Sequence, residues 1–343
     1  MNRLLEQMRE LTQLRGVSGR EEGVREYLIQ RIAGHCDSYE VDNMGNLIVH
    51  KKGKRASEKK VLFSAHMDEV GFIITHITPE GMLHFETVGG VTPAVTAGRP
   101  VLVGEQAIPG VIGTRPVHLI TEEERKEYAK IEDMRIDIGA KDKAEAEKMV
   151  SPGDQATFIG PWKELGENSI LARAIDDRAG CALLLGMLQG ELEYDCTFAF
   201  VVQEETGCAG SKAVAFSQRP DIAVAVESTT AGDLPTAPDG RQVCRVGAGP
   251  VISFMDKGTI YPWDLYQKAV KIAEDAGIPW QTKEGVFGGN DARSYVSSAG
   301  GAKVLAVSLP VRYLHSANTL VNKADIDHAR QLLDLLAKEL PRG

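Results

Sequence analysis

The stretch "DRAGCALLLGMLQGELEYDCTFAFVVQEETG", residues 177–207, predicts a packed helix followed by a buried strand. The run "DRAGCALLLGMLQG" has the length of a helix, and "CTFAFVVQ" is a short apolar run typical of a strand with both faces covered. Two adjacent carboxylates, Glu204 and Glu205, follow the strand, and a Thr206–Gly207 turn comes next. Because neighbours in an extended strand point to opposite faces, the strand must stop by about Gln203 if both carboxylates are to face one pocket.

The same alternation of helix and strand extends to both sides of this stretch. Ser18 and Glu21 form the pattern of a capping box, which predicts a helix from residue 18 to about residue 32. Further strands are expected at residues 39–50 (two strands with a turn near 43–45), 61–65, 221–228 and 302–310, and further helices at 211–218, 262–276 and 323–339. This order predicts an α/β fold with a mixed sheet covered by helices on both faces.

The composition and residue pattern of the sequence change between residues 70 and 162. Short β-prone runs such as "GFIITHI", "PVLVGEQAIPGVIG" and "DQATFIG" alternate with glycine and proline, and the charged stretch 121–150 has a helical composition. We expect residues 70–162 to form a small β-rich domain inserted into an α/β domain made of residues 1–69 and 163–343. A long excursion of a single domain is the alternative.

Composition excludes several classes of protein. The chain has 343 residues, with 39 Lys and Arg against 48 Asp and Glu, a formal charge of −9. That balance argues against a nucleic-acid surface, and no apolar run reaches the roughly 20 residues needed to cross a bilayer. The first 16 residues carry charges throughout, unlike a signal peptide. Five scattered cysteines without a CxxC pair suggest reduced thiols in a cytoplasmic protein.

Histidine and carboxylate side chains recur where the expected strands end. Asp176 and Asp177 alone could simply cap a helix, and a lone histidine at a strand end is more often structural. Their repetition along one sheet instead favours a shared site, because loops at strand ends carry the catalytic groups of such sheets. The residues concerned are His66, Asp68, Asp176, Asp177, Glu204, Glu205, Glu227 and His315.

The Glu204–Glu205 pair is best explained by a divalent cation. One carboxylate would bind the metal, while the other would stay free and accept a proton from the attacking water. Histidine and carboxylate ligands suit Zn²⁺, Co²⁺ or Mn²⁺ in a hydrolytic site. Two histidines and three carboxylates exceed the needs of one catalytic zinc and suffice for two metal ions.

An ordered set of motifs, spread over nearly the whole chain, resembles the dinuclear aminopeptidases that form tetrahedral, TET-type particles. That family includes glutamyl and leucyl aminopeptidases and members once labelled cellulases. The motifs are "AHMDE" (65–69), "AIDDRAG" (174–180), "QEETGCAG" (203–210), "VEST" (226–229) and "LHSANT" (314–319).

The resemblance implies a zinc-peptidase-like sheet and an enzyme that removes N-terminal residues from short peptides. It also implies that the insert mediates dimer contacts and that six dimers build a hollow dodecamer. The implied roles are a bridging carboxylate for Asp176, ligands of one metal for His66 and Glu227, ligands of the other for Glu205 and His315, general base for Glu204, orientation of the first histidine for Asp68, and a cis peptide before Asp177.

The chain departs from the family pattern at two positions. Glu227 stands where many members have Asp, and Asn290 in "FGGNDARS" replaces a Thr near the pocket for the substrate's first side chain. Arg293 in the same run could attract an acidic side chain, although a surface arginine at a helix start is at least as good an interpretation.

Other classes of function remain open from the residues. A carboxypeptidase or deacylase could use the same metal cage, and Arg178 or Arg312 could then clamp a substrate carboxylate. A glycosidase is less consistent, since it needs two carboxyls across a sugar rather than a histidine-rich cage. A non-enzymatic scaffold would need a lost ligand or base, and none is missing.

Overall fold

Four parallel strands form the centre of the large sheet, and they are the apolar runs that the sequence marks as strands. In spatial order they are β12 (Cys196–Val201), β3 (Val61–His66), β13 (Ile222–Thr230) and β16 (Lys303–Arg312). The computed structural model describes residues 2–123, 126–238 and 242–342. Parallel order matters for function because it brings the carboxyl ends of these strands to one edge of the sheet.

Antiparallel strands extend the sheet on both sides and make it mixed, as predicted. One side carries β2 (Leu47–Lys51) and β1 (Ser38–Val41), and the other carries β17 (Thr319–Asn322), β11 (Ser169–Ala172) and β10 (Lys163–Leu165). Two short strands, β14 (Val251–Ile252) and β15 (Gln281–Thr282), pair beside β16.

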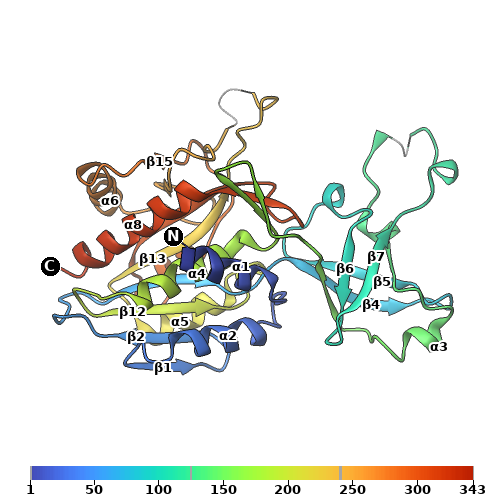
Figure 1. Ribbon diagram of the computed structural model, residues 1–343, viewed down its shortest axis with the longest axis horizontal. Helices are drawn as coiled ribbons and strands as arrows, with labels where there is room; N and C mark the ends of the chain where they lie inside the picture. Colours follow the sequence, from blue (N-terminus) through green and yellow to red (C-terminus); the bar gives the residue numbers. More distant parts are fainter. Residues whose placement is uncertain (1, 124–125, 239–241, 343) are drawn as a thin grey trace.

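Helices cover both faces of the sheet (Figure 1). Alternate residues of β3 enter different cores: Phe63 packs in the larger one and Leu62 in the smaller one on the opposite face. The larger core is covered by α1 (Asn2–Gln13), α2 (Glu22–Ile32), α4 (Ile175–Gln189), α6 (Trp263–Asp275) and α8 (Lys323–Glu339), and the smaller by α5 (Ala209–Gln218) and α7 (Ala292–Ser297). No helix in the described ranges is long and apolar enough to cross a membrane.

A closed six-stranded barrel is inserted between β3 and β10 and lies beside the sheet (Figure 1). Its strands, in barrel order, are β4 (Gly71–Ile77), β5 (Leu83–Val88), β8 (Arg135–Asp137), β7 (Ile108–Gly113), β6 (Pro100–Val103) and β9 (Gln155–Phe158). It has its own apolar core, in which the ring of Phe72 packs edge-on against Phe85 and Phe158 at centroid distances of 5.1 and 5.0 Å. A mixed α/β sheet with an inserted β-rich domain is thus confirmed.

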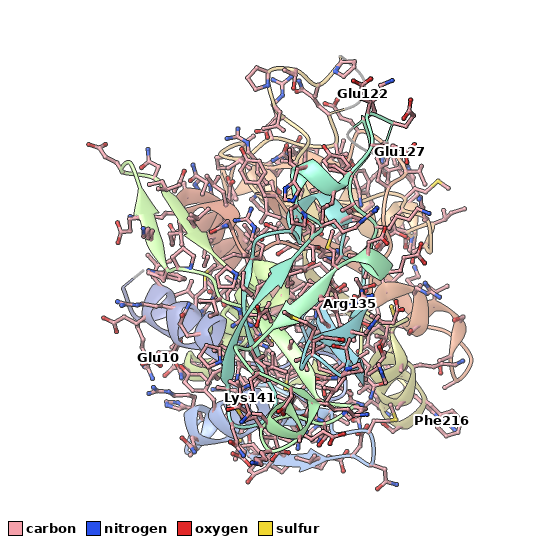
Figure 2. The ribbon with its side chains drawn as sticks, turned by 90° about the vertical axis from the view of Figure 1, so that its right-hand side faces the viewer. Glu10, Glu122, Glu127, Arg135, Lys141 and Phe216 are labelled. Carbon is pink, nitrogen blue, oxygen red and sulfur yellow. The ribbon has the colours of Figure 1, made fainter. Side chains whose placement is uncertain are left out.

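The predicted helix in the charged stretch 121–150 is wrong. The elements with described bounds are a 3-10 turn (Ile131–Asp133), strand β8 and the four-residue helix α3 (Lys143–Ala146), while residues 124–125 lie outside the described ranges. Met134 and Ile136 enter the barrel core, so closing the barrel overrides local helix propensity. Glu122, Glu127, Arg135 and Lys141 lie on the side of the molecule that the barrel forms (Figure 2).

The predicted capping box at Ser18 is also wrong. Helix α2 begins at Glu22, and Ser18 instead donates from Oγ to Oδ2 of Asp68 at 2.6 Å. Glu21 accepts from the backbone N–H of Gly19 at 2.7 Å and of Gln203 at 3.2 Å. Ser18 and Glu21 therefore do not cap the helix together. Ser18 instead hydrogen-bonds the buried carboxylate of Asp68, and the carboxylate of Glu21 binds backbone N–H groups outside the helix.

The end of helix α1 is tied to the sheet by a buried ionic cluster. Arg178, fully buried, donates to the backbone carbonyls of Leu11 and Leu14 at 2.7 and 3.1 Å, and Arg173 also donates to Leu14. Glu69 forms an ion pair with Arg173 and lies 3.6 Å from Arg178. One carboxylate thus compensates two buried guanidinium groups.

We expect Glu69→Gln to destabilise the protein by about 3 kcal/mol, because removing one partner leaves buried charge uncompensated. The midpoint of denaturant-induced unfolding measures the loss. Glu191→Gln is the control: it breaks an ion pair with Lys54 at 2.7 Å between two exposed side chains, which water and salt screen, so the unfolding midpoint should change little. Equal shifts for the two variants would contradict the role given to Glu69.

Candidate metal centre

The predicted site residues converge at the carboxyl edge of the parallel strands. His66 is the last residue of β3, Glu204 and Glu205 follow β12, and His315 follows β16. Asp176 lies in the irregular first turn of α4, where its backbone angles are not helical. The expectation that Glu227 ends its strand is wrong: β13 continues to Thr230, and Glu227 pairs with Ser308 inside the ladder.

Asp176 lies between the two histidines. Its Oδ1 is 3.4 Å from Nε2 of His66, and its Oδ2 is 3.3 Å from Nε2 of His315. On the His66 side, Oε2 of Glu227 lies 3.7 Å from the same Nε2, and on the other side Oε1 of Glu205 lies 3.2 Å from Nε2 of His315. The side chains therefore form two histidine–carboxylate groups that share one aspartate.

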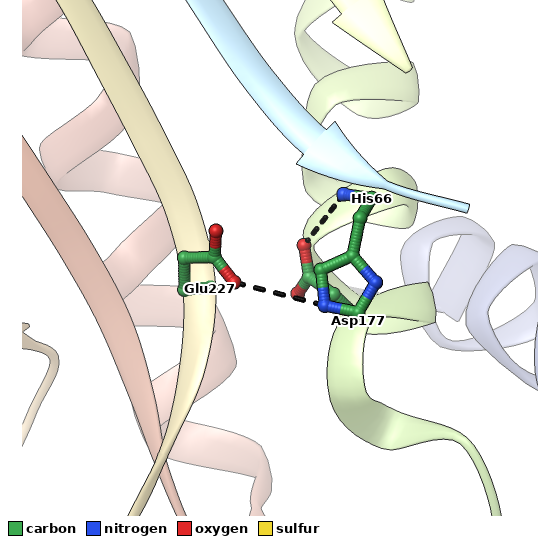
Figure 3. Close-up of side chains that lie close together, drawn as sticks. All are labelled: His66, Asp177 and Glu227. Carbon is green, nitrogen blue, oxygen red and sulfur yellow. Dashed lines mark hydrogen bonds and ion pairs between the residues drawn. The ribbon is translucent and has the colours of Figure 1, made fainter. Parts of the chain in front are cut away.

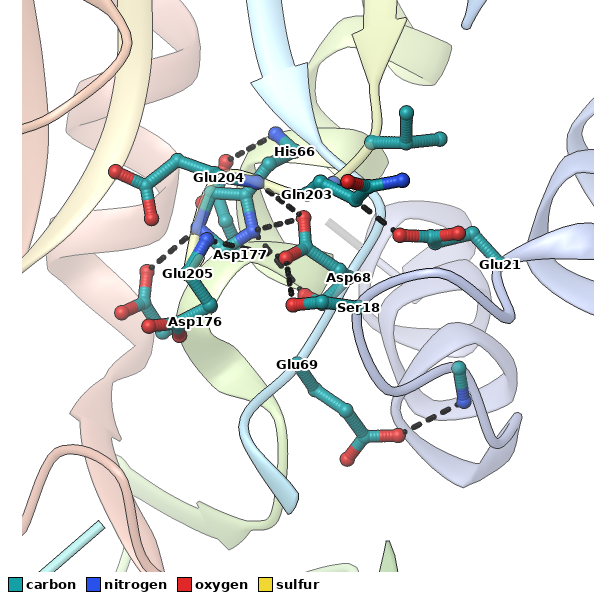
Figure 4. Close-up of polar contacts among 12 residues, drawn as sticks. Ser18, Glu21, His66, Asp68, Glu69, Asp176, Asp177, Gln203, Glu204 and Glu205 are labelled. Carbon is teal, nitrogen blue, oxygen red and sulfur yellow. Dashed lines mark hydrogen bonds and ion pairs between the residues drawn. The ribbon is translucent and has the colours of Figure 1, made fainter. Parts of the chain in front are cut away.

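The turn after β12 turns both glutamates toward this site. The strand ends at Val201, and Gln203 takes a left-handed conformation with φ of 55°. The backbone N–H groups of Glu204 and Glu205 then donate to the two carboxylate oxygens of Asp68 at 3.0 and 3.1 Å (Figure 4). The expectation that the strand stops by Gln203 is confirmed, and Asp68 fixes the turn.

Asp68 also contacts the first histidine. Its backbone carbonyl lies 3.1 Å and its Oδ1 3.4 Å from Nδ1 of His66. Burial alone would raise the pKa of Asp68, but hydrogen bonding and charge attraction from His66 hold that pKa below its usual range. Asp68 is therefore an anion that can hold the His66 ring with Nε2 directed at Asp176.

Asp177 caps the helix that follows it. The Asp176–Asp177 peptide bond is cis, as the resemblance implies. Asp177 accepts from the backbone N–H of Gly180 at 3.1 Å and from that of His66 at 3.3 Å, and it lies beside Glu227 (Figure 3). Burial raises the pKa of the Asp177 carboxyl well above its usual range.

Two buried carboxylate oxygens lack the hydrogen bond that burial normally demands. Oδ1 of Asp176 and Oε1 of Glu205 accept none within the described part of the chain, although a histidine Nε2 lies 3.4 and 3.2 Å away. Ligand atoms of His66, Asp176 and Glu205 lie within 4.8 Å of one another, as do those of His66, Asp177 and Glu227. Unsatisfied carboxylate oxygens facing imidazole nitrogens fit a divalent cation.

The electrostatics of the site favour positive charge. Burial lowers the pKa of a histidine, yet the carboxylates of Asp176 and Glu205, 3.3 and 3.2 Å from Nε2, raise that of His315 to about 11. The pKa of Glu204 rises to about 8, chiefly through burial, with repulsion from Asp291 and Glu205 adding to it against attraction from His66. Cations between these groups would offset both the burial and the repulsion.

Residues 45–332 match the sequence pattern of the M42 glutamyl aminopeptidase family. The chain belongs to the M42 aminopeptidases. This is a family of metal-dependent peptide-bond hydrolases, so the predicted family and enzyme class are confirmed.

Relatives and solved structures match over nearly the full length of this M42 chain. A putative aminopeptidase of Acetivibrio thermocellus is 37% identical, with 95% of this chain and 96% of the relative covered. The lysyl aminopeptidase of Pyrococcus furiosus is 31% identical, with 98% and 97% covered. Aminopeptidase APDkam598 of Desulfurococcus kamchatkensis has a TM-score of 0.93 at 32% identity, with 98% and 95% covered.

A further solved structure bears on assembly in the M42 family. The TET1 peptidase of Pyrococcus horikoshii, which can assemble into a tetrahedron or a large octahedral shell, has a TM-score of 0.86 at 38% identity, with 98% and 99% covered.

Sequence reasoning missed three residues around the site of this M42 chain. Asp291 is fully buried and lies with Cys208 and Glu204, the ligand atoms of the three being within 4.8 Å. The thiol of Cys208 donates to Oε1 of Glu204 at 3.4 Å, so a cysteine does contact the site. Lys283 lines the cleft of about 220 Å³ that opens beside the site. Asp291 lies in the run "FGGNDARS" and Cys208 in the motif at 203–210, but neither was assigned a role, and Lys283 lies outside every motif.

The departure at Asn290 has a structural basis. Its side-chain amide donates to the Tyr261 hydroxyl at 3.0 Å and to Asp256 at 3.3 Å, and its Oδ1 accepts from the backbone N–H of Ala292. Asn290 thus stabilises the start of α7 as well as lining the cleft. Arg293 is exposed and is not among the residues that line the cleft.

Proposed function

We propose that this chain is an aminopeptidase that removes the first residue from short peptides and holds two divalent cations in the cleft. His66 and Glu227 would bind one, His315 and Glu205 the other, and Asp176 would bridge them. The observation that carries this proposal is the position of Asp176, with one carboxylate oxygen near each histidine. When bound, the cations supply Lewis acidity that activates water and polarises the scissile carbonyl.

The mixed nitrogen and oxygen donors suit Zn²⁺ best, with Co²⁺ or Mn²⁺ as alternatives. Glu227 reaches its position from inside β13, and the extra methylene compared with Asp lets its Oε2 approach His66 to 3.7 Å. The substitution therefore retains a ligand on that side of the site.

Glu204 is the proposed general base. Its side chain lines the cleft beside the ligand groups. Cys208, a weak donor, makes the hydrogen bond to its Oε1, so the oxygen keeps its basicity. Glu204 would take a proton from the attacking water and return it to the leaving amine. Asp68 is proposed to position His66 by holding Nδ1, as a metal-binding histidine usually requires.

The charge of the site supports attack at the amino terminus. Asp176, Glu204, Glu205 and Glu227 would balance the formal +4 of two divalent cations, and the Asp68 anion beside them would leave the site negative, so it suits a substrate ammonium better than another carboxylate. The two arginines that could clamp a carboxylate are engaged elsewhere. Arg178 is buried against the end of α1, and Arg312 makes a two-pronged pair with Asp233 at 2.6 and 2.7 Å.

The cation of Lys283 favours an acidic first side chain in the substrate. Among the described residues that line the cleft, Lys283 is the one lysine or arginine, and its Nζ donates to the Phe287 carbonyl at 2.6 Å. Ser228, Thr229 and Thr230 line the same cleft and can hydrogen-bond a carboxylate. Relatives differ here, since the family is named for glutamyl and one relative for lysyl activity.

We expect Lys283→Met to lower the ratio of kcat/KM for a glutamyl amide over a leucyl amide by about tenfold, the effect of losing roughly one charge-assisted hydrogen bond. Lys283→Arg should keep most of the preference. Arg293→Met is the control, because that side chain is exposed outside the cleft, and its ratio should not change. A change in Arg293→Met alone would move the specificity site to the arginine.

The barrel is the proposed dimer contact, and a tetrahedral dodecamer of six dimers is the proposed assembly. In this scheme residues 1–69 and 163–343 form the catalytic domain and residues 70–162 the dimerisation domain. Support comes from a related TET1 peptidase with a dodecamer in its asymmetric unit. Leu119 and Tyr128, between β7 and β8, are 60% and 75% exposed, as apolar contact residues of a separated subunit would be.

Chromogenic amides of single amino acids test the proposed activity. The protein is assayed with Zn²⁺, Co²⁺ or Mn²⁺ and with a chelator. We expect metal-dependent release of the chromogenic amine from unblocked aminoacyl amides, with the glutamyl amide preferred. No hydrolysis with any of the three metals would contradict the proposal, and a carboxypeptidase or deacylase would remain as alternatives.

A further inference from the structure

We infer that the inserted barrel completes the metal group around His315 and Glu205, and that the Gly89–Gly90 bend positions both side chains. The inference rests on the proposed metal-binding role of these two residues. Gly89 and Gly90 directly follow β5, so they are part of the inserted segment and not of the α/β sheet. They are nevertheless in contact with the edge of that sheet.

The backbone carbonyl of Gly90 lies 3.0 Å from Nδ1 of His315. A carbonyl can only accept a hydrogen bond, so this contact puts the ring proton on Nδ1. In the neutral ring, which is the form that binds a cation, Nε2 is then the unprotonated nitrogen, and it is this nitrogen that lies near Asp176 and Glu205. Such a partner on the second ring nitrogen fixes both the tautomer and the direction of a metal-binding histidine.

Close approach explains why the bend consists of two glycines. A Cβ on Gly90 would lie 3.1 Å from Nδ1 and 3.4 Å from Cε1 of His315. Gly89 has a φ of +80°, which disfavours other residues, and a Cβ there would lie 2.8 Å from Val70 and 3.2 Å from the Cβ of Glu205. A side chain at either position would push a proposed ligand away from the site.

The two histidines of the proposed metal site are held in place by different parts of the chain. His66 is held at Nδ1 by Asp68, which follows the same strand, and its side chain is 1% exposed. His315 has a left-handed φ of 56°, its side chain is 26% exposed, and the acceptor for its Nδ1 comes from the barrel. Disturbing the bend should therefore weaken binding of the cation at His315 and Glu205 and leave binding of the cation at His66 and Glu227 unchanged.

The test is Gly90→Ala, with Gly113→Ala in the same barrel as the matched control. An added Cβ on Gly113 has no neighbour closer than 4.0 Å, and Gly113 has no positive φ. Zn²⁺ binding is measured by competition with a chromophoric chelator, and bound zinc is counted after dialysis. We expect Gly90→Ala to weaken one of two sites by about 10- to 100-fold, the typical effect of losing such a partner, and Gly113→Ala to weaken neither.

The outcomes separate the inference from the function on which it rests. If the unmodified protein binds fewer than two zinc ions, the proposed dinuclear site fails. If it binds two and Gly90→Ala binds both with unchanged affinity, the inference alone is overturned. A general folding defect would instead weaken both sites and lower the unfolding temperature, and this result would also count against selective positioning.

A second measurement needs no variant. Zn²⁺ should slow hydrogen exchange of amides in residues 88–91 of the unmodified protein, because a cation that orders His315 also favours its contact with Gly90. Residues 108–113 serve as the internal control within the barrel. Unchanged exchange in residues 88–91 at saturating Zn²⁺ would overturn the inference even if Gly90→Ala does not fold.

Discussion

Glu204→Gln should lower turnover by about 100- to 10,000-fold while two divalent cations stay bound, as expected for loss of a general base. The amide keeps the shape of the side chain and an oxygen that can still accept from the Cys208 thiol. It cannot take up a proton from the attacking water. The backbone of the turn should be unaffected, since it is held through the N–H groups of residues 204 and 205 by Asp68.

Glu205→Gln is the matched comparison, because it replaces a carboxylate by an amide of the same shape at the neighbouring residue. Its Oε1 lies 3.2 Å from Nε2 of His315, so we expect loss of one cation together with loss of activity. Zinc content and kcat are measured for both variants. Normal turnover in Glu204→Gln would reject the general base, and lost metal in that variant would mean that the two glutamates have exchanged roles.

Apolar runs made the fold of the α/β part predictable. Strands β3, β13 and β16 are buried on both faces over most of their length, so their sequences are rich in apolar residues, chiefly Val, Leu and Ala. Helix α8 was predicted with its observed bounds, Lys323–Glu339, because its apolar periodicity is strong. These signals are local, and tertiary contacts reinforce them.

Long-range contacts explain why the predicted capping box at Ser18 and the predicted helix in residues 121–150 are wrong. Nothing near Ser18 in the sequence shows that its hydroxyl bonds to Asp68, fifty residues away. The charged stretch at 121–150 has helical composition, but β8 must pair with β5 and β7 to close the barrel. In both cases contacts with residues distant in the sequence override the local preference for a helix cap or a helix.

The candidate site was predictable only as far as its residues fall in motifs. His66, Asp176, Glu205 and His315 were identified because each lies at the edge of a recognisable element. Gly90 was not, since a backbone carbonyl leaves no mark in the sequence. Lys283 lies outside the motifs, and its place in the cleft depends on how the segment after α6 folds over the sheet.

An N-terminal acetyl group on the substrate should lower cleavage by at least about 100-fold. The carboxylates at the site attract the free ammonium of a peptide, and acetylation removes that charge and adds bulk where the amine would bind. Amidation of the C-terminus should have little effect, because the first residue is the one removed. The ammonium of Lys283 in the cleft can also bind a C-terminal carboxylate, so the two ends of the substrate must be blocked separately.

The most direct test of the account is therefore mass spectrometry of one peptide in three forms: unblocked, N-acetylated and C-amidated. With added Zn²⁺ or Co²⁺, we predict successive loss of residues from the amino end of the unblocked and amidated forms and an intact acetylated form. Loss of residues from the carboxyl end, or equal cleavage of the acetylated peptide, would contradict the aminopeptidase account and favour the carboxypeptidase or deacylase alternative.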